Sequence, residues 1–142
     1  QSALDGWAQA RAALLEVRIA NRTRNRAETL RADLGARVTV FDWVQAGDML
    51  DGAATVVNTT ALGMDGKPEL RVPLDALRRD ALVTDIGYRP LVTPFLRTAA
   101  AMGCRTVDGL GMLLHQAVPG FERWFGRRPE VDAETRAAVL AP

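Results

Sequence analysis

The sequence is poor in the residues that build disulfides, metal sites and membrane spans. Its 142 residues contain one cysteine, Cys104, and one histidine, His115. A single cysteine excludes an internal disulfide and fits a reducing compartment. One cysteine and one histidine are also too few for a structural zinc site, which usually has four such ligands. No apolar run reaches the roughly 18 residues of a membrane span, and the first residues lack a signal-peptide pattern. These absences favour a cytoplasmic enzyme or binding domain with no metal and no membrane partner.

An excess of charge of either sign is also lacking. The chain has 18 Lys and Arg against 17 Asp and Glu, so its net charge is +1. Such a balance gives no global attraction to nucleic acid or to anionic membranes. The length suffices for one domain with a sizeable core. We therefore expect one globular domain with a small-molecule ligand, and the sequence leaves open whether it is a monomer or a homodimer.

Short runs rich in β-branched residues alternate with helical segments along the chain. The expected strands are residues 16–20, 37–41, 54–58, 81–86 and 104–107. The expected helical segments are residues 24–34, 43–50, 74–77, 93–102 and the chain beyond Gly109, with interruptions at Pro119, Gly126 and Pro129. The middle runs hardly alternate, which predicts strands buried on both faces. The order predicts an α/β fold: a Rossmann-like open, mostly parallel sheet flanked by helices, with a helical C-terminus.

The first fifteen residues do not fit this order. A dinucleotide-binding domain normally opens with a strand, a G-x-G-x-x-G turn and a helix, and no such turn occurs here. Residues 10–15 look like part of that helix, yet they run directly into the strand at Glu16. Because a parallel crossover needs about a dozen residues or more, we expect missing segments, with chain breaks near Ala10–Arg11 and Leu15–Glu16.

The stretch RIANRTRNRAETL, residues 18–30, concentrates arginines directly after the first expected strand. At this place in dinucleotide sites an acidic residue selects NAD, whereas a nearby arginine accommodates the 2′-phosphate of NADP. Asn21 is uncharged, and the planar guanidinium of Arg22 can hold a phosphate or stack on adenine. Thr23 is a typical helix N-cap, and Arg26 follows one turn later. The alternative is an ordinary solvated loop.

Two polar stretches follow the third and fourth expected strands. In VVNTTALGM, residues 56–64, the side chains of Asn58, Thr59 and Thr60 can hydrogen-bond ribose or nicotinamide, because ligands bind at strand carboxyl ends in open α/β sheets. A plain polar turn is the alternative. In TDIGYRPLVTPFL, residues 84–96, Tyr88 lies just past a strand and can be a ligand contact or a packed aromatic. Thr93 and Pro94 then have the pattern of an N-cap and a first helical residue.

The last stretch, VDGLGMLLHQA, residues 107–117, has two glycines at a strand-to-helix turn. Glycine lets backbone approach a flat ligand closely, which makes Gly109 and Gly111 candidates for a cofactor wall. Gln116 is a polar side chain after an apolar run. We interpret His115 as a surface or helix-packing residue, and Cys104 as a buried, inert thiol.

Taken together, IANRTRNRAETL, VVNTTALGM, DIGYRPLVTPFL and VDGLGMLLHQAV closely resemble the C-terminal cofactor domain of shikimate dehydrogenases. The four motifs occur in the right order between residue 17 and about residue 125. The resemblance implies an oxidoreductase that reduces 3-dehydroshikimate to shikimate with NADPH, in chorismate and aromatic amino-acid biosynthesis. It also implies that residues 1–142 are the NADP-binding Rossmann-like domain, and that the N-terminal substrate domain and the glycine-rich turn are not in this sequence.

The resemblance also assigns roles to individual residues. The 2′-phosphate motif of the family maps onto Asn21, Arg22, Thr23 and Arg26. The segment that lines the cofactor maps onto Asn58, Thr59 and Thr60, the neighbours of the nicotinamide onto Ile86 and Gly109, and the substrate contacts onto Tyr88 and Gln116.

Two features depart from the family pattern. The catalytic lysine and its partner aspartate lie in the family's separate N-terminal domain, so no residue of this chain is assigned as catalytic. Asp85 and Asp108 are expected near the cleft, but they do not match that pair. Pro119 lies in the helix that carries Gln116, and it predicts that this helix kinks or ends early.

Several other functions are compatible with parts of the pattern. A quinate- or NAD-preferring relative is disfavoured by Arg22 and by the lack of an acid at position 21. Another Rossmann reductase is disfavoured because Tyr88 and Gln116 suit a polar, hydroxylated substrate. A non-catalytic nucleotide-sensing module would account for the absent catalytic pair. A nucleic-acid binder built on residues 18–26 is disfavoured by the balanced charge and the lack of interleaved aromatics.

Overall fold

Five parallel strands and four helices make up residues 16–141, the part of the chain that the structure describes. This computed structural model divides the chain into two units. Unit 1 comprises Gln1–Asp51 with Val72–Ala76, and unit 2 comprises Gly52–Arg71 with Leu77–Pro142. Each unit is described by itself.

Unit 1 contains a strand, a helix and a strand in the order β1 (Val17–Ala20), α2 (Arg24–Leu34) and β2 (Val38–Phe41). The strands pair in parallel, and the register ends with Ala20 opposite Phe41. The helix contacts both strands. The side chains that follow the two strands therefore leave the same edge of this small sheet.

Helix α2 ends at a glycine, as predicted. Gly35 has a positive φ of 89°, and its N–H donates to the Arg31 carbonyl, a conformation that glycine adopts without a Cβ penalty. After β2 come two short 3-10 helices, η1 (Trp43–Gln45) and η2 (Asp48–Leu50). They confirm the helical turns expected in residues 43–50.

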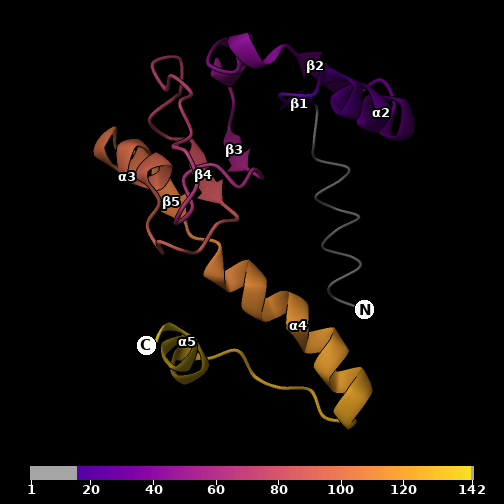
Figure 1. Cartoon of the computed structure of the whole chain (residues 1–142), viewed down its shortest axis with the longest axis vertical. Coiled ribbons are helices and arrows are strands. Elements are labelled where there is room, and N and C mark those ends of the chain that lie inside the picture. Colours follow the sequence, from indigo (N-terminus) through magenta and orange to yellow (C-terminus); the bar gives the residue numbers. More distant parts are fainter. Residues whose placement is uncertain (1–15, 142) are drawn as a thin grey trace. The chain divides into compact units, whose positions relative to one another are not determined.

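Unit 2 contains a three-stranded parallel sheet with the order β3–β4–β5 (Figure 1). The strands are β3 (Thr55–Asn58), β4 (Leu82–Asp85) and β5 (Arg105–Val107). Helix α3 (Pro94–Ala101) packs against β4 and β5. Because β4 has a strand on each side and a helix over it, Asp85 is completely buried at its end.

The helices of unit 2 begin and end largely as the sequence indicates. Thr93 is the N-cap of α3, its side chain accepts a hydrogen bond from the Leu96 N–H, and Pro94 is the first helical residue. The C-terminal part consists of α4 (Leu110–Phe125) and α5 (Ala133–Leu140), which contact each other. Within residues 16–141, no helix combines the length and apolar character that crossing a membrane requires.

The parallel α/β class is confirmed, and every strand lies within its predicted range. Hydrogen bonding, however, divides the strands into two sheets rather than one, and the division coincides with the two units. The expected burial on both faces is wrong for the edge of unit 2, where Val57 in β3 is 49% exposed. An edge strand has a partner on one side only, so it is covered less completely than β4.

Two helix predictions are wrong. No helix forms over residues 74–77. Leu74 and Leu77 lie in a loop, and both side chains are buried. Their helix-like spacing therefore comes from two separate buried positions in the loop. Helix α4 also continues past Pro119, so the expected early end is wrong, while a kink at Pro119 stays a prediction. Proline removes one N–H and leaves the carbonyl of His115 without its usual partner, but His115 is exposed, so water can satisfy that carbonyl. The expected chain breaks near Ala10–Arg11 and Leu15–Glu16 lie outside the described residues.

Candidate cofactor site

In unit 1, a tight turn connects β1 to α2. The Asn21 side-chain oxygen accepts a hydrogen bond of 2.8 Å from the Thr23 N–H, an Asx turn that fixes the loop. Thr23 occupies the N-cap position of α2 as predicted, but its hydroxyl makes no capping hydrogen bond. The first N–H groups of the helix thus receive no side-chain cap, and uncapped N–H groups at the positive end of a helix dipole suit an anion.

The arginines around this turn fall into two kinds. Arg18 donates from Nη1 to the carbonyl oxygens of Met49, at 3.0 Å, and Asp51, at 2.5 Å, so it holds the chain after η2 in place. By contrast, Arg22 and Arg26 are exposed, and the guanidinium of neither has a hydrogen bond or an ion pair within residues 16–141. The two arginines predicted to bind the 2′-phosphate therefore remain available to a ligand.

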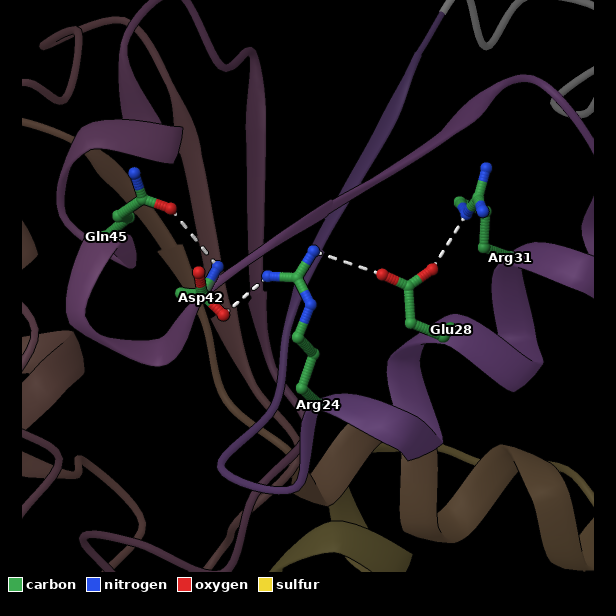
Figure 2. Close-up of polar contacts among 5 residues, drawn as sticks. All are labelled: Arg24, Glu28, Arg31, Asp42 and Gln45. Carbon is green, nitrogen blue, oxygen red and sulfur yellow. Dashed lines mark hydrogen bonds and ion pairs between the residues drawn. The ribbon is translucent and has the colours of Figure 1, made fainter.

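Arg24, between them in sequence, is fully engaged (Figure 2). It donates from Nη1 to Asp42 at 2.5 Å and from Nη2 to Glu28 at 3.1 Å. The bond to Asp42 raises the pKa of the Arg24 guanidinium above its ordinary value. The other oxygen of Glu28 accepts from Arg31 at 2.9 Å, and Arg31 together with Arg24 holds the pKa of Glu28 below its ordinary value.

In unit 2, the turn after β3 is organised by the buried side chain of Asn58. Its Nδ2 donates to the Leu62 carbonyl at 3.3 Å and to Asp85 Oδ2 at 3.0 Å. Its Oδ1 accepts from the N–H and the hydroxyl of Thr60, at 3.0 and 2.8 Å. An amide has two donor hydrogens and two acceptor lone pairs, so all of them are used. The sequence prediction of a ligand contact from Asn58 therefore has no free donor or acceptor to support it.

The two threonines of the turn differ. Thr60 is bonded to Asn58, and its hydroxyl also accepts from the Leu62 N–H at 3.1 Å. Thr59 is exposed, and its side chain has no partner in the described part of the chain. Thr59 is thus the side chain of this turn that is free to meet a ligand.

Asp85, at the end of β4, is the centre of the buried network. It accepts from three donors: Asn58 Nδ2, the Gly87 N–H at 2.9 Å, and the Thr93 hydroxyl at 2.8 Å. Three donors stabilise a buried carboxylate, and they tie the ends of β3, β4 and α3 to one another. The sequence placed Asp85 near the cleft but missed this role; the signal was an acid at a buried strand end, two residues before a glycine.

The two predicted neighbours of the nicotinamide, Ile86 and Gly109, lie in contact. A Cβ on Gly109 would come within 2.3 Å of the Ile86 carbonyl oxygen and 2.7 Å of the Gly87 carbonyl oxygen. The Gly109 backbone therefore lies tightly against the backbone of Ile86 and Gly87. Its approach to a flat ligand stays a prediction.

The predicted substrate residues are placed differently. Tyr88 is half-buried in the loop after β4, and Gln116 is exposed on α4. Gln116 follows Gly109 by seven residues, which is two helical turns and about 10 Å along the same helix face. No hydrogen bond in residues 16–141 uses the Tyr88 hydroxyl or the Gln116 amide.

Three further residues have structural surroundings. Asp108 accepts from the Leu110 N–H at 3.1 Å and pairs with Arg136 at 2.5 Å, so it caps α4 and ties α5 to it. Cys104 is buried and free, as predicted. The described residues contain no cluster of three or more histidine, cysteine or acidic side chains that could hold a metal.

Comparison with known proteins decides the family. Residues 109–139 match the Shikimate 5′-dehydrogenase C-terminal domain. The Shikimate dehydrogenase (NADP(+)) of Paracoccus denitrificans (strain Pd 1222) is 69% identical over 126 residues, and that of Cereibacter sphaeroides (strain ATCC 17025) is 70% identical. The chain belongs to the shikimate dehydrogenase family. Each match covers 89% of this chain and 45% of the relative, so the chain spans about half the length of the relatives it matches.

Solved structures of the shikimate dehydrogenase family and its neighbours share the fold. Quinate dehydrogenase from Corynebacterium glutamicum in complex with NAD has a TM-score of 0.81 and 31% identity, over 94% of this chain and 49% of its own. Shikimate 5-dehydrogenase from Thermus thermophilus in complex with NADP(H) and shikimate has a TM-score of 0.68 and 34% identity, over 84% and 44%. Because the neighbours include NAD and NADP complexes, the fold by itself does not determine the nucleotide.

Proposed function

We propose that this chain is the NADP-binding domain of a cytoplasmic shikimate dehydrogenase, which reduces 3-dehydroshikimate to shikimate with NADPH. The observation that carries the proposal is the pair Arg22 and Arg26: two exposed, unpaired cations beside an uncapped helix start, with Asn21 in place of an acid. These groups fit a 2′-phosphate in charge and in hydrogen-bond donors. The names of the 69–70% identical relatives, which include NADP(+), support the same nucleotide.

The chain's own residues would bind and orient, while NADPH supplies the hydride. Arg22 and Arg26 hold the 2′-phosphate, with Asn21 and Thr23 shaping the turn. In unit 2, Thr59 and the backbone of the turn that Asn58 organises line the nucleotide. Ile86 and Gly109 form the wall beside the nicotinamide.

Substrate recognition falls to Tyr88 and Gln116 in this proposal. The phenol and the amide are both free to hydrogen-bond hydroxyl groups of shikimate. The ketone that receives a hydride also needs a proton. No residue of this chain is assigned to supply it, because Asp85 and Asp108 already accept hydrogen bonds from the protein.

A second candidate is a quinate dehydrogenase that uses NAD. The observation in its favour is the TM-score of 0.81 to the Corynebacterium glutamicum quinate dehydrogenase in complex with NAD. The free cations at Arg22 and Arg26 argue against it, since NAD has no 2′-phosphate for them to bind.

Steady-state kinetics on the gene product that contains this chain separate the two candidates. We expect the kcat/KM for shikimate with NADP to exceed that for quinate with NAD by at least about tenfold, which corresponds to about 1.4 kcal/mol. A higher kcat/KM for quinate with NAD would favour the second candidate. No turnover of either substrate with either nucleotide would overturn both.

A further inference from the structure

The phosphate-binding edge of unit 1 carries an acid that the proposed function does not explain. Asn21 and Asp42 are the first residues after β1 and β2, whose register ends with Ala20 opposite Phe41. Neighbouring strands lie about 5 Å apart, so Asp42 follows the strand beside the proposed 2′-phosphate site. A free carboxylate there would repel a phosphate dianion and compete with it for Arg22.

Asp42 is held in this place by its local structure. Its N–H donates to the Gln45 side-chain oxygen at 3.3 Å, and its carbonyl accepts from the Gln45 N–H at 2.9 Å. Its carboxylate faces Arg24, at 2.5 Å (Figure 2). The acid is thus fixed close to the site, and Arg24 is the cation that neutralises it.

Glu28 is a second acid near the start of α2, and Arg24 engages it as well. The two residues are an i, i+4 pair with Nη2 and Oε1 3.1 Å apart, and residues at this spacing lie on the same face of a helix. Arg26 is two positions from each of them, so it does not share that face. Figure 2 shows the resulting open row of alternating charges, Asp42, Arg24, Glu28 and Arg31, in which Arg26 takes no part.

We propose that Arg24 is a positioning residue for nucleotide specificity: it occupies the carboxylates of Asp42 and Glu28, so that Arg22 and Arg26 stay free for the 2′-phosphate. The role of Arg24 rests on the proposed function, because it presupposes a phosphate at this edge. The guanidinium is suited to this task, since its planar fork can bridge two carboxylates at once, which a lysine ammonium does less well.

The test uses Arg24→Gln in the gene product that contains this chain, with NADP and NAD affinities measured by fluorescence titration. Released carboxylates should weaken NADP binding by about three- to tenfold, the range of an exposed ion pair or slightly above it. NAD binding should change by less than about twofold. The loss of NADP affinity should shrink at high salt, because exposed charges are screened.

A second variant tests whether Arg24 acts by occupying the carboxylate of Asp42 or by contacting the phosphate itself. Arg24→Gln/Asp42→Asn removes the released carboxylate of Asp42, while Glu28 keeps Arg31 as its partner. NADP affinity should therefore return to within about twofold of wild type. A double variant as weak as Arg24→Gln would overturn the proposal, since it would mean that Arg24 acts through its own charge. The matched control is Arg78→Gln, which breaks the exposed Arg78–Asp80 pair in unit 2 and should leave both affinities unchanged.

The outcomes also distinguish this proposal from the function it rests on. A wild type that binds NADP no more tightly than NAD overturns the proposed function and the role of Arg24 together. A wild type that prefers NADP, and keeps that preference in Arg24→Gln, overturns the role of Arg24 alone. Equal losses for NADP and NAD would also overturn it, because they would assign Arg24 to the fold of the loop.

Discussion

The two units hold their site residues in opposite ways. In unit 1, the candidate ligand-binding side chains, Arg22 and Arg26, are exposed and have no partner among the described residues. In unit 2, Asn58 and Asp85 are buried and fully hydrogen-bonded to the protein. The contrast separates two tasks. Unpaired side chains at the surface can bind a ligand, whereas fully hydrogen-bonded side chains in the core hold the backbone that the ligand contacts.

The contrast makes a general prediction about substitutions. In unit 1 they should change ligand affinity and leave stability nearly intact, because exposed side chains contribute little to folding. In unit 2 they should lower the free energy of unfolding, because buried polar groups are costly to leave unpaired. Four experiments on the gene product that contains this chain test the division.

The largest effect is expected for Asp85→Ala. It leaves three buried donors without their acceptor, namely the Asn58 amide, the Thr93 hydroxyl and the Gly87 N–H. Each unsatisfied group costs about 1–3 kcal/mol, so the free energy of unfolding in urea should fall by about 3 kcal/mol or more. The control Asp80→Ala removes an exposed carboxylate and should cost at most about 1 kcal/mol. Equal losses would contradict the buried network.

The next largest effect is expected for Gly109→Ala. The new Cβ would lie 2.3 Å from the Ile86 carbonyl oxygen, and overpacking against backbone costs about 1–3 kcal/mol. The matched control is Gly111→Ala in the same helix, where a Cβ meets nothing within 4 Å. There alanine should be neutral or stabilising by up to about 1 kcal/mol. Thermal unfolding of both variants checks the pair, and a destabilised Gly111→Ala would point to a general cost of side chains at this turn.

Arg22→Ala should affect binding and not folding. It deletes a charge-assisted contact worth about 1.5–3 kcal/mol, which is roughly ten- to a hundredfold in NADP affinity. NAD lacks the phosphate, so its affinity should change far less, and the unfolding midpoint should stay the same. Titration of both nucleotides into wild type and variant decides this. Parallel losses would mean that Arg22 supports the loop or the adenine.

The smallest effects are expected for Tyr88→Phe and Gln116→Ala. Both side chains are polar and make no hydrogen bond within residues 16–141, so they should behave like the exposed groups of unit 1. Each supplies one hydrogen bond to a neutral hydroxyl, worth about 0.5–1.5 kcal/mol. The KM for shikimate should therefore rise about two- to tenfold, with NADP affinity unchanged. A fall in unfolding stability instead would make Tyr88 a packing residue.

Local signals account for what could be predicted from the sequence. Runs of β-branched residues gave the five strands, and the Thr93–Pro94 pair marked the start of α3, because these preferences act within a few residues of the chain. Gly35 ended α2 for the same reason, through its own backbone freedom. The role proposed for Arg22 and Arg26 rests on their place after β1 and on the family motif, and it stays a prediction.

The rest depended on contacts between distant parts of the sequence. Asp85 meets Asn58 across 27 positions, and Arg24 meets Asp42 across 18. The i, i+4 spacing of Arg24 and Glu28 is visible in the sequence, but the pairing of Arg24 with Asp42 is not. Similarly, α4 continues through Pro119 because its surroundings are exposed to solvent, and a residue's helix propensity does not predict this exposure.

The saturated amide of Asn58 has a consequence for inhibitor design. A compound that aims a donor or an acceptor at this side chain must first break a bond inside the protein, so the contact adds little affinity. An anionic group aimed at Arg22 and Arg26 meets no such competitor among residues 16–141. Medicinal chemistry on this domain should therefore begin at the loop after β1 and treat the turn after β3 as a rigid wall.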